Sequence, residues 1–254
     1  SGTRTPSIAE FFCGAPASTY FGRTDLGGIS LQSGTYSGFE GTKFWAAEDI
    51  DRGPTCTNLS VSPNQQVTWS GINISGKNGL TFKGLFAANH LNANNWEGTS
   101  FADPDFVAVE YRIDGGAWVT GIAFYASGTS NTQTLKQDIN GDMIGEGQDL
   151  TYAFTEFTVN IAGTGTTLDL RLNASINGGV EEIAVDNFRL LEVSCTAPTV
   201  PTLAATVNPV CNGASTTLNI TGTLNDATQW AIYTGSCGGS LVGTTASSTF
   251  VVSP

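Results

Sequence analysis

The chain has 254 residues, which is enough for one large β-domain or two smaller ones, each with its own core. Its 10 Lys and Arg residues stand against 22 Asp and Glu residues, and the resulting net charge of -12 argues against binding to nucleic acid or to anionic membranes. The sequence has no apolar run near the length of a membrane span and no N-terminal signal-peptide pattern. We therefore expect a soluble, mature chain without membrane insertion.

The composition and the cysteines indicate an oxidising, extracellular setting. Only 13% of the residues are charged, whereas Gly, Thr, Ser and Asn are abundant, a balance typical of extracellular β-proteins. No C-x-x-C pair is present, which argues against a zinc site and allows one or two disulfides among Cys13, Cys56, Cys195, Cys211 and Cys237. The odd count leaves one thiol free or paired outside the chain. Connectivity cannot be read from sequence; we expect Cys13 to pair with Cys56.

Strand signals follow one another along most of the chain. Short apolar or alternating runs, bounded by Gly, Asn and Ser, occupy residues 43–50, 66–74, 80–88, 106–113, 117–127, 152–163, 167–176 and 181–193. The Asp-Gly-Gly turn at 114–116 predicts a hairpin between the fourth and fifth of these runs. In 167–176 every second residue is apolar, which is typical of a strand with one solvated side. No segment of useful length has a helical period.

The strand pattern and a later change in composition predict two all-β domains. About eight or nine strands separated by short turns imply a two-sheet sandwich with jelly-roll topology. From Ala197 to Pro254 the only charged residue is Asp226, and Thr, Ser, Gly and small apolar residues dominate. We therefore expect a jelly-roll β-sandwich domain over residues 1–194 and a smaller β-sandwich over residues 195–254.

The second segment contains three phrases in a recognisable order: PTLAATVNPVCNGASTTLNITG, QWAIYTGSCGGSLVG and TFVVSP. This order resembles the immunoglobulin-like repeats found in tandem in large secreted surface proteins of gliding bacteria. The resemblance implies an immunoglobulin-type sandwich of about seven strands, of which about five are present. We therefore expect an incomplete immunoglobulin-like domain whose sheet edge is completed by a neighbouring domain or subunit.

The first segment carries a second resemblance. The phrases SGFEGTKFWAAEDID, LTFKGLFAA, DPDFVAVEYRIDGGAW and EEIAVDNFRL occur in this order over about 150 residues. They resemble an uncharacterised jelly-roll module of bacterial exported proteins, which occurs beside hydrolase or nuclease domains and in adhesin-like arrays. The ending of this segment is also similar to that of carbohydrate-binding modules. The resemblance implies a fold and an extracellular location, and no particular ligand.

The stretch QDINGDMIGEGQD at 137–149 gathers acidic and amide side chains in a chain poor in positive charge. It matches the spacing of the calcium loop, with ligands expected from Asp138, Asn140, Asp142, the Ile144 carbonyl, Glu146 and Asp149. The loop departs from that pattern at its sixth position, where Met143 replaces the usual Gly, and at its last, where Asp149 replaces Glu. Repulsion between like charges about 4 Å apart costs on the order of 1 to 4 kcal/mol. Bound calcium would replace this repulsion with attraction. We expect a structural calcium site; the alternative is a solvated acidic turn.

Acidic residues at 40–51 and Asp186 form a second candidate. Asp186 shares an alternating strand face with Ala184, Phe188 and Leu190, and a carboxylate among apolar neighbours needs a cation or hydrogen-bond donors. The jelly-roll resemblance implies a structural calcium where the first and last strands meet. We therefore expect calcium ligands from Glu40, Glu48, Asp49 and Asp186, with Asp51 nearby. The alternative is a pair of exposed acidic turns and one hydrogen-bonded Asp.

Sugar binding would use aromatic faces together with amide or carboxylate edges. Trp96 and Glu97 lie in a long polar loop and are the expected ligand-binding residues, with a Trp96 that only anchors its loop as the alternative. The patterns around Trp45, Trp69 and Trp118 indicate core positions.

Catalytic motifs are scarce. His90 is the only histidine, and no nucleophile motif accompanies it, so we expect no Ser/His/Asp chemistry. A carboxylate pair for glycoside hydrolysis remains open, because its spacing exists only in three dimensions; the candidates are Glu97, Asp103, Asp105 and Glu110.

These features predict a non-catalytic, calcium-stabilised extracellular segment of a larger cell-surface or secreted protein, acting in adhesion or carbohydrate binding. The expected partner is a glycan or another cell-surface ligand. The alternatives are an accessory binding module of a secreted polysaccharide hydrolase, and a filament or stalk subunit that a neighbour completes by strand addition.

Overall fold

The computed structural model describes residues 2–57, 61–89, 96–132, 134–193, 196–235 and 239–253. It contains two compact units, Ser1–Val193 and Ser194–Pro254. Both are built from antiparallel strands, and the single helical element in the described residues is the 3-10 turn η1 (Ile50–Arg52). The predicted all-β class is confirmed. The described part of the chain holds no helix with the length and apolar character needed to cross a bilayer.

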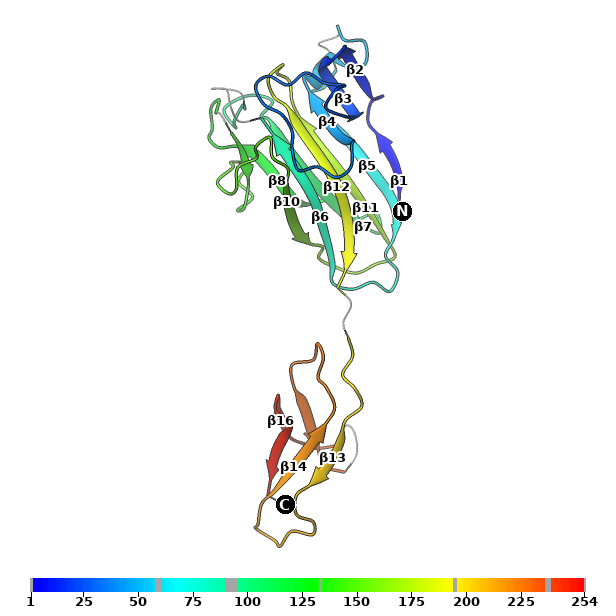
Figure 1. Ribbon diagram of the computed structural model, residues 1–254, viewed down its shortest axis with the longest axis vertical. Helices are drawn as coiled ribbons and strands as arrows, with labels where there is room; N and C mark the ends of the chain where they lie inside the picture. Colours follow the sequence, from blue (N-terminus) through cyan, green and yellow to red (C-terminus); the bar gives the residue numbers. More distant parts are fainter. Residues whose placement is uncertain are drawn as a thin grey trace. The chain divides into compact units, whose positions relative to one another are not determined.

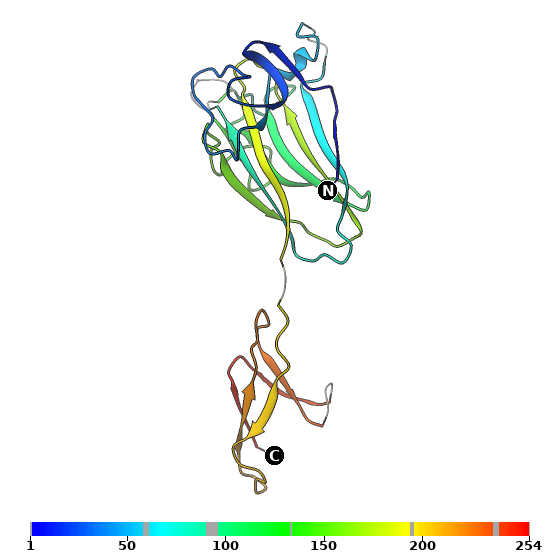
Figure 2. The same cartoon turned by 45° about the vertical axis from the view of Figure 1, so that its right-hand side comes forward.

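The first unit is a sandwich of two six-stranded sheets, visible as two layers in Figure 1 and Figure 2. The first sheet has the order β1 (Thr3–Pro6), β5 (Asn64–Asn73), β11 (Thr167–Ser175), β7 (Phe106–Ile113), β8 (Val119–Ala126) and β9 (Leu135–Gln137). The second has the order β10 (Thr155–Asn160), β6 (Leu80–Ala88), β12 (Ile183–Glu192), β4 (Phe44–Glu48), β3 (Ala17–Thr24) and β2 (Phe11–Gly14). This arrangement confirms the predicted jelly-roll β-sandwich.

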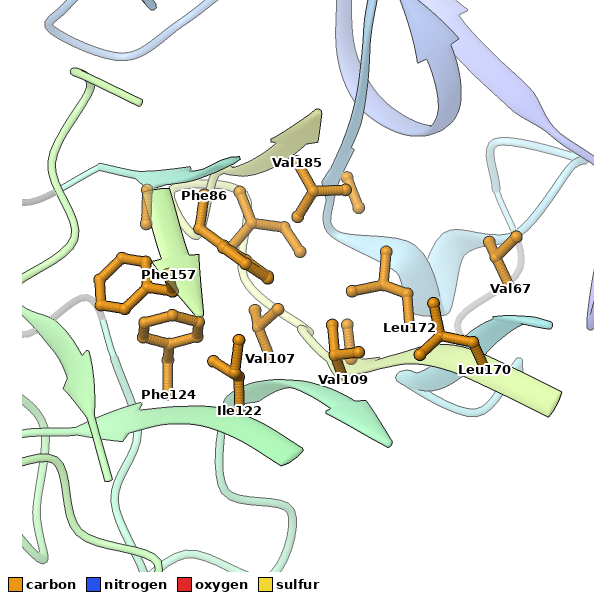
Figure 3. Packing of buried hydrophobic residues seen from close by; sticks show 14 of the residues in the cluster. Val67, Phe86, Val107, Val109, Ile122, Phe124, Phe157, Leu170, Leu172 and Val185 are labelled. Carbon is orange, nitrogen blue, oxygen red and sulfur yellow. The ribbon is translucent and has the colours of Figure 1, made fainter. Parts of the chain in front are cut away.

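The core lies between the two sheets because every second residue of each strand faces inward. In β11 the residues Leu168, Leu170, Leu172 and Ala174 are buried, as their alternation predicts. Figure 3 shows Phe124 of the first sheet facing Phe86 and Phe157 of the second. The ring of Phe124 lies 5.0 Å from Phe86 and 4.8 Å from Phe157, measured between centroids. The predicted hairpin is also confirmed, since β7 pairs with β8.

A smaller aromatic cluster covers the other face of the second sheet. Tyr36 packs edge-on against Phe44 of β4 and against Tyr152 and Phe154, which precede β10. These contacts hold the long loop between β3 and β4 on the sheet. The same loop and Tyr152 reach the acidic residues described below.

The N-terminal strands β1 to β3 were absent from the sequence prediction, and a disulfide holds part of this region. Cys13 in β2 bonds to Cys56, which follows η1. The predicted pairing is therefore confirmed. Cys211 is free and exposed, while Cys195 and Cys237 lie outside the described residues.

The second unit has a three-stranded sheet of β13 (Thr202–Ala205), β14 (Thr216–Thr221) and β17 (Thr249–Val252). A two-stranded sheet of β15 (Trp230–Tyr233) and β16 (Leu241–Thr245) accompanies it. Its buried apolar side chains in the described residues are Ile220 and Ile232. Several others are strongly exposed, including Leu203 at 57% and Val251 at 63%. A unit with so little core leaves apolar surface for a partner to cover.

Candidate functional site

The loop between β9 and β10 brings together three of its predicted calcium ligands. One carboxylate oxygen each from Asp138, Asp142 and Glu146 lies within 4.8 Å of the others, the only such trio of acidic, His or Cys ligand atoms in the described residues. Backbone amides hold the first of these in place, since Asp138 accepts N–H bonds from Gly141 at 2.6 Å and Met143 at 3.0 Å. Three carboxylate oxygens at this spacing can bind one calcium ion.

The other predicted ligands of this loop have different surroundings. Asn140 donates from its side chain to Asp142 at 3.3 Å, so it lies beside the trio. Ile144 donates its N–H to Asp142 at 3.0 Å. Asp149 instead forms an ion pair with Lys136 at 3.1 Å and is not part of the trio. A bridge between Lys136 and Asp149 places the Asp149 carboxylate beside the lysine, so the structure does not bring Asp149 into the trio, and its role as a ligand stays a prediction.

Met143 adopts the backbone conformation that the sixth position of a calcium loop requires. Its φ of 69° lies in the left-handed region, which costs a residue with a side chain about 1 kcal/mol or more. We expect Met143→Gly to raise the free energy of unfolding by about 0.5 to 1 kcal/mol, measured by chemical denaturation. Ile139→Gly in the same loop is the control, because Ile139 has no positive φ and should lose stability instead. Equal changes in both variants would contradict this account of the loop.

A second group of carboxylates is buried at one end of the sandwich. The buried acidic cluster consists of side chains that are at most 5% exposed, namely Glu48, Asp49, Asp105, Glu181 and Glu182. They come from three places: the junction of β4 with η1, the residue before β7, and the two residues before β12. Glu97, which is half-buried, donates its backbone N–H to Asp105 at 2.5 Å.

Some oxygens of the buried acidic cluster have partners and others do not. Glu181 accepts N–H bonds from Asn177 at 2.9 Å and Gly178 at 2.7 Å. Glu182 accepts the Tyr152 hydroxyl at 2.6 Å, and Asp49 pairs with Arg52. In contrast, Glu48 Oε2 and Asp105 Oδ1 are buried without a hydrogen-bond partner among the described residues. A buried, unpartnered carboxylate oxygen is costly, and it becomes favourable when a cation binds it.

The surroundings raise the pKa values of these carboxyls. Burial raises the pKa of Glu48 to about 9, and the nearby Glu182 contributes in the same direction. Burial and the neighbouring Glu181 raise the pKa of Asp105 to about 9 as well. The pKa of Glu181 rises to about 7, because burial outweighs the two backbone N–H bonds that it accepts. The cluster therefore favours protonated carboxyls unless a cation compensates their charge.

The structure divides the second predicted calcium group into two places. Glu48 and Asp49 belong to the buried acidic cluster, and Asp51 adjoins them through Asp49. Asp186 instead accepts the backbone N–H of Glu40 at 2.8 Å, and the Glu40 carboxylate accepts the side-chain amide of Asn187. Glu40 and Asp186 thus fix a loop on β12, which corrects the prediction of one shared site.

The reason for this correction is a bulge in β12. Asn187 has a φ of 50°, and the pairing with β6 shifts register between Asp186 and Arg189. An extra residue turns the following side chains to the other face of the sheet. Phe188 therefore packs against the main core, whereas Ala184 belongs to the smaller aromatic cluster. The simple alternation that placed Asp186 beside Phe188 does not hold.

Trp96 is also misassigned by the sequence prediction. Its side chain is 0% exposed and belongs to the main core, and its indole N–H donates to the Asn89 carbonyl at 3.1 Å. It cannot stack on a sugar, so the prediction of a binding platform is wrong. Glu97, its predicted companion, lies beside the buried acidic cluster instead.

Trp118, predicted as a core residue, lies on the outer face of the first sheet. The guanidinium carbons of Arg112 and Arg171 lie 4.6 Å and 4.2 Å from the centroid of its ring. Arg112 is paired with Asp169 at 2.8 Å, and Arg171 with Glu110 at 2.6 Å. Glu110 therefore serves an ion pair on this face, while Asp105 is buried, so these two do not form an exposed carboxylate pair.

A groove of about 430 Å³ runs beside Trp118. We call it the sheet-face groove; its lining residues are Thr5, Pro6, Ser7, Gln66, Thr68, Ser70, Arg112, Trp118 and Arg171. The alternation of residues in β5 explains the polar lining of this groove, since Val67 faces the core and its neighbours Gln66 and Thr68 face outward. Hydroxyl, amide and guanidinium groups beside an aromatic ring form a surface that can bind a polyhydroxylated ligand.

Comparisons with known proteins give similarity at the level of solved structures only. No family model matches the chain, and no curated protein matches it. Three similar solved structures are CBM35 from Cellvibrio japonicus Abf62, an adhesin domain of Lys-gingipain and a xylan-binding domain. The first has 11% identity and a TM-score of 0.32, and the match covers 76% of this chain and 95% of that one.

The other two similarities are of the same order. The K3 cleaved adhesin domain of Lys-gingipain from Porphyromonas gingivalis has 16% identity and a TM-score of 0.33, with 74% of this chain and 100% of that chain covered. The CBM22-1 xylan-binding domain from Paenibacillus barcinonensis Xyn10C has 14% identity and a TM-score of 0.30, with 76% and 98% covered. TM-scores this low carry no argument about function, which therefore depends on the residues of this chain.

Proposed function

We propose that the chain is a non-catalytic extracellular module that binds carbohydrate and is stabilised by calcium. The observation that carries the binding function is the sheet-face groove, in which Trp118 lies beside rows of hydroxyl and amide side chains. Planar polar groups can bond to sugar hydroxyls, while the apolar face of a sugar ring packs on an aromatic side chain. The composition of the chain supports the extracellular location.

Calcium would act at two places in this proposal. The trio Asp138, Asp142 and Glu146 offers a loop site with three carboxylate oxygens close together. The buried acidic cluster offers a second site, where Glu48 Oε2 and Asp105 Oδ1 have no partner in the described residues. Calcium prefers oxygen ligands and accepts irregular geometry. In both places it would replace repulsion between carboxylates with attraction and fix the segments that carry them.

We expect Trp118→Ala to weaken binding of a neutral oligosaccharide about tenfold or more, because it removes an aromatic ring from the groove together with the surface on which Arg112 and Arg171 stack. A glycan array in the presence of calcium would first select the sugar, and calorimetry would measure its affinity. Phe101→Ala is the matched control, since Phe101 is an aromatic residue outside the groove with 36% exposure. Equal affinity of Trp118→Ala and the unaltered chain would exclude this surface.

The second unit favours an additional role in assembly. Its apolar side chains Leu203, Leu241 and Val251 are each more than half exposed, at 57%, 58% and 63%. A strand from a neighbouring domain or subunit could cover them by adding to an open sheet edge. An accessory role beside a hydrolase would use the same sheet-face groove. Turnover of a polysaccharide by this chain alone would contradict the non-catalytic proposal.

A further inference from the structure

A cavity of about 370 Å³ lies where one edge of the sandwich opens. It shares no lining residue with the sheet-face groove. Its walls come from β1 and β5 of the first sheet and from β3, β4 and β12 of the second, which can be followed in Figure 1. The volume suits one or two small rings. Neither the calcium sites nor the groove uses Arg23, Trp45 or Trp69.

Two Arg–Trp pairs, one on each sheet, line this cavity. Arg23 of β3 is the register partner of Trp45 of β4, and Arg4 of β1 is the register partner of Trp69 of β5. Directly opposed residues of an antiparallel pair place their side chains on the same face. Both tryptophans pack against the core between the sheets, so both arginines are attached on the inward faces, where the sandwich opens to solvent.

The inward position of Arg23 is unusual for its strand. Two residues earlier, Phe21 is fully buried on the same face and packs edge-on against Trp45 at 4.9 Å. An apolar residue at position 23 would simply extend this core row. The arginine is exposed, and its backbone N–H donates to Glu10 at 3.1 Å. The indole N–H of Trp45 is buried and has no acceptor in the described part of the chain.

The charge distribution makes Arg23 exceptional in the whole molecule. The chain has only 10 Lys and Arg residues. Nine of them form ion pairs, including Arg4 with Glu10 and Lys43 with Asp25 at this cavity. Arg23 is the only basic residue of the described structure whose side chain has no acidic partner. A free guanidinium in a chain of net charge -12 leaves a carboxylate-binding position beside two aromatic rings.

We propose that this cavity binds an acidic sugar, meaning a carbohydrate ring with an isolated carboxylate. This inference depends on the proposed carbohydrate-binding function and names a second ligand class at a separate site. Arg23 binds the carboxylate, and the rings of Trp45 and Trp69 contact the apolar face of the sugar. Asp186 and Asn187, which also line the cavity, are hydrogen-bonding groups for hydroxyls. The negative charge of the chain and Asp186 disfavour polyanions such as nucleic acid or heavily sulfated chains.

The test uses the full chain and two probes that differ in charge. Digalacturonate supplies the carboxylate, and the corresponding galactose disaccharide supplies the same ring without it. Calorimetry at low and high salt should show binding of digalacturonate that weakens with salt, and at least tenfold weaker binding of the neutral disaccharide. Arg23→Gln should lose at least tenfold in affinity for digalacturonate, while Arg23→Lys, which keeps the charge, should lose less.

The controls separate this site from the sheet-face groove. Trp118→Ala should bind digalacturonate like the unaltered chain, and Arg23→Gln should bind the neutral sugar selected on the array like the unaltered chain. Failure of digalacturonate to bind, with normal binding of the neutral sugar, would overturn this inference and leave the proposed function intact. Equal digalacturonate affinity of Arg23→Gln would also overturn it. So would preferential binding of a short peptide through its C-terminal carboxylate, because the cavity would then recognise protein.

Discussion

When calcium is chelated, the chain is expected to become less stable as the pH rises from about 4 to about 9. The buried acidic cluster is the cause. In the folded protein the pKa values of Glu48 and Asp105 are both raised to about 9, first by burial and then by neighbouring carboxyls. In the unfolded chain these groups titrate near their ordinary pKa values of 4.5 and 3.8.

The sign of the effect follows from these raised pKa values. Each carboxyl binds its proton more tightly in the folded protein than in the unfolded chain. The stability gained in this way is therefore complete below about pH 4 and is lost as the pH rises through the folded pKa values. One pKa unit corresponds to about 1.4 kcal/mol, so shifts of this size in two carboxyls make the loss over this range at least several kcal/mol.

Calcium should reverse this loss, because it binds the ionised carboxylates. At one hundred times its dissociation constant it would add about 2.7 kcal/mol to the free energy of unfolding. Thermal midpoints measured with calcium and with chelator should therefore diverge as the pH rises. Glu48→Gln should reduce the divergence, whereas Asp103→Asn, an exposed acidic residue outside the cluster, should leave it unchanged. Coinciding curves at every pH would contradict a calcium role in this cluster.

Removal of the Cys13–Cys56 disulfide is expected to cost about 4 kcal/mol in the free energy of unfolding. The bond closes a loop with a sequence separation of 43 residues, and the unfolded chain gains conformational freedom when the loop is opened. The double variant Cys13→Ser, Cys56→Ser should show this loss in chemical denaturation. Cys211→Ser is the control, because Cys211 is free and exposed and its replacement should have almost no effect. A similar small change in both variants would show that the β2 region contributes little to stability.

The strands that sequence analysis found are those with long, regular patterns. β11 alternates between apolar and polar residues, and β7 has an apolar residue at every second position from Val107 to Ile113, so both appear in sequence as they do in structure. β1 to β3 were not predicted: β1 and β2 have only four residues each, and β1 is stabilised by pairing with the distant strand β5. Local sequence carries little information about such pairing.

The candidate sites likewise differ in whether their residues are close together in sequence. The loop trio is contained in one stretch of sequence, so spacing alone could predict Asp138, Asp142 and Glu146. The buried acidic cluster draws on three distant segments, and sequence analysis found Glu48 and Asp49 but missed Asp105, Glu181 and Glu182 as their partners. Their only signal is an acidic residue directly before an apolar strand, as in DPDFVAV and EEIAV.

The burial of individual tryptophan side chains also could not be predicted from the sequence. Trp96 lies in a polar stretch and yet is fully buried, whereas Trp118 lies in an apolar stretch and borders solvent. The bulge at Asn187 likewise reverses the faces of β12. Each of these outcomes depends on packing against distant residues or on how two strands pair, and local periodicity encodes neither.

The most direct measurement is the calcium content of the purified chain, determined by elemental analysis after dialysis against a calcium buffer. We expect two calcium ions per chain. Asp138→Ala should remove the ion of the loop, and Glu48→Gln should weaken the ion of the buried acidic cluster. A chain that carries no calcium under these conditions would show that its clustered carboxylates are not neutralised by a bound divalent cation.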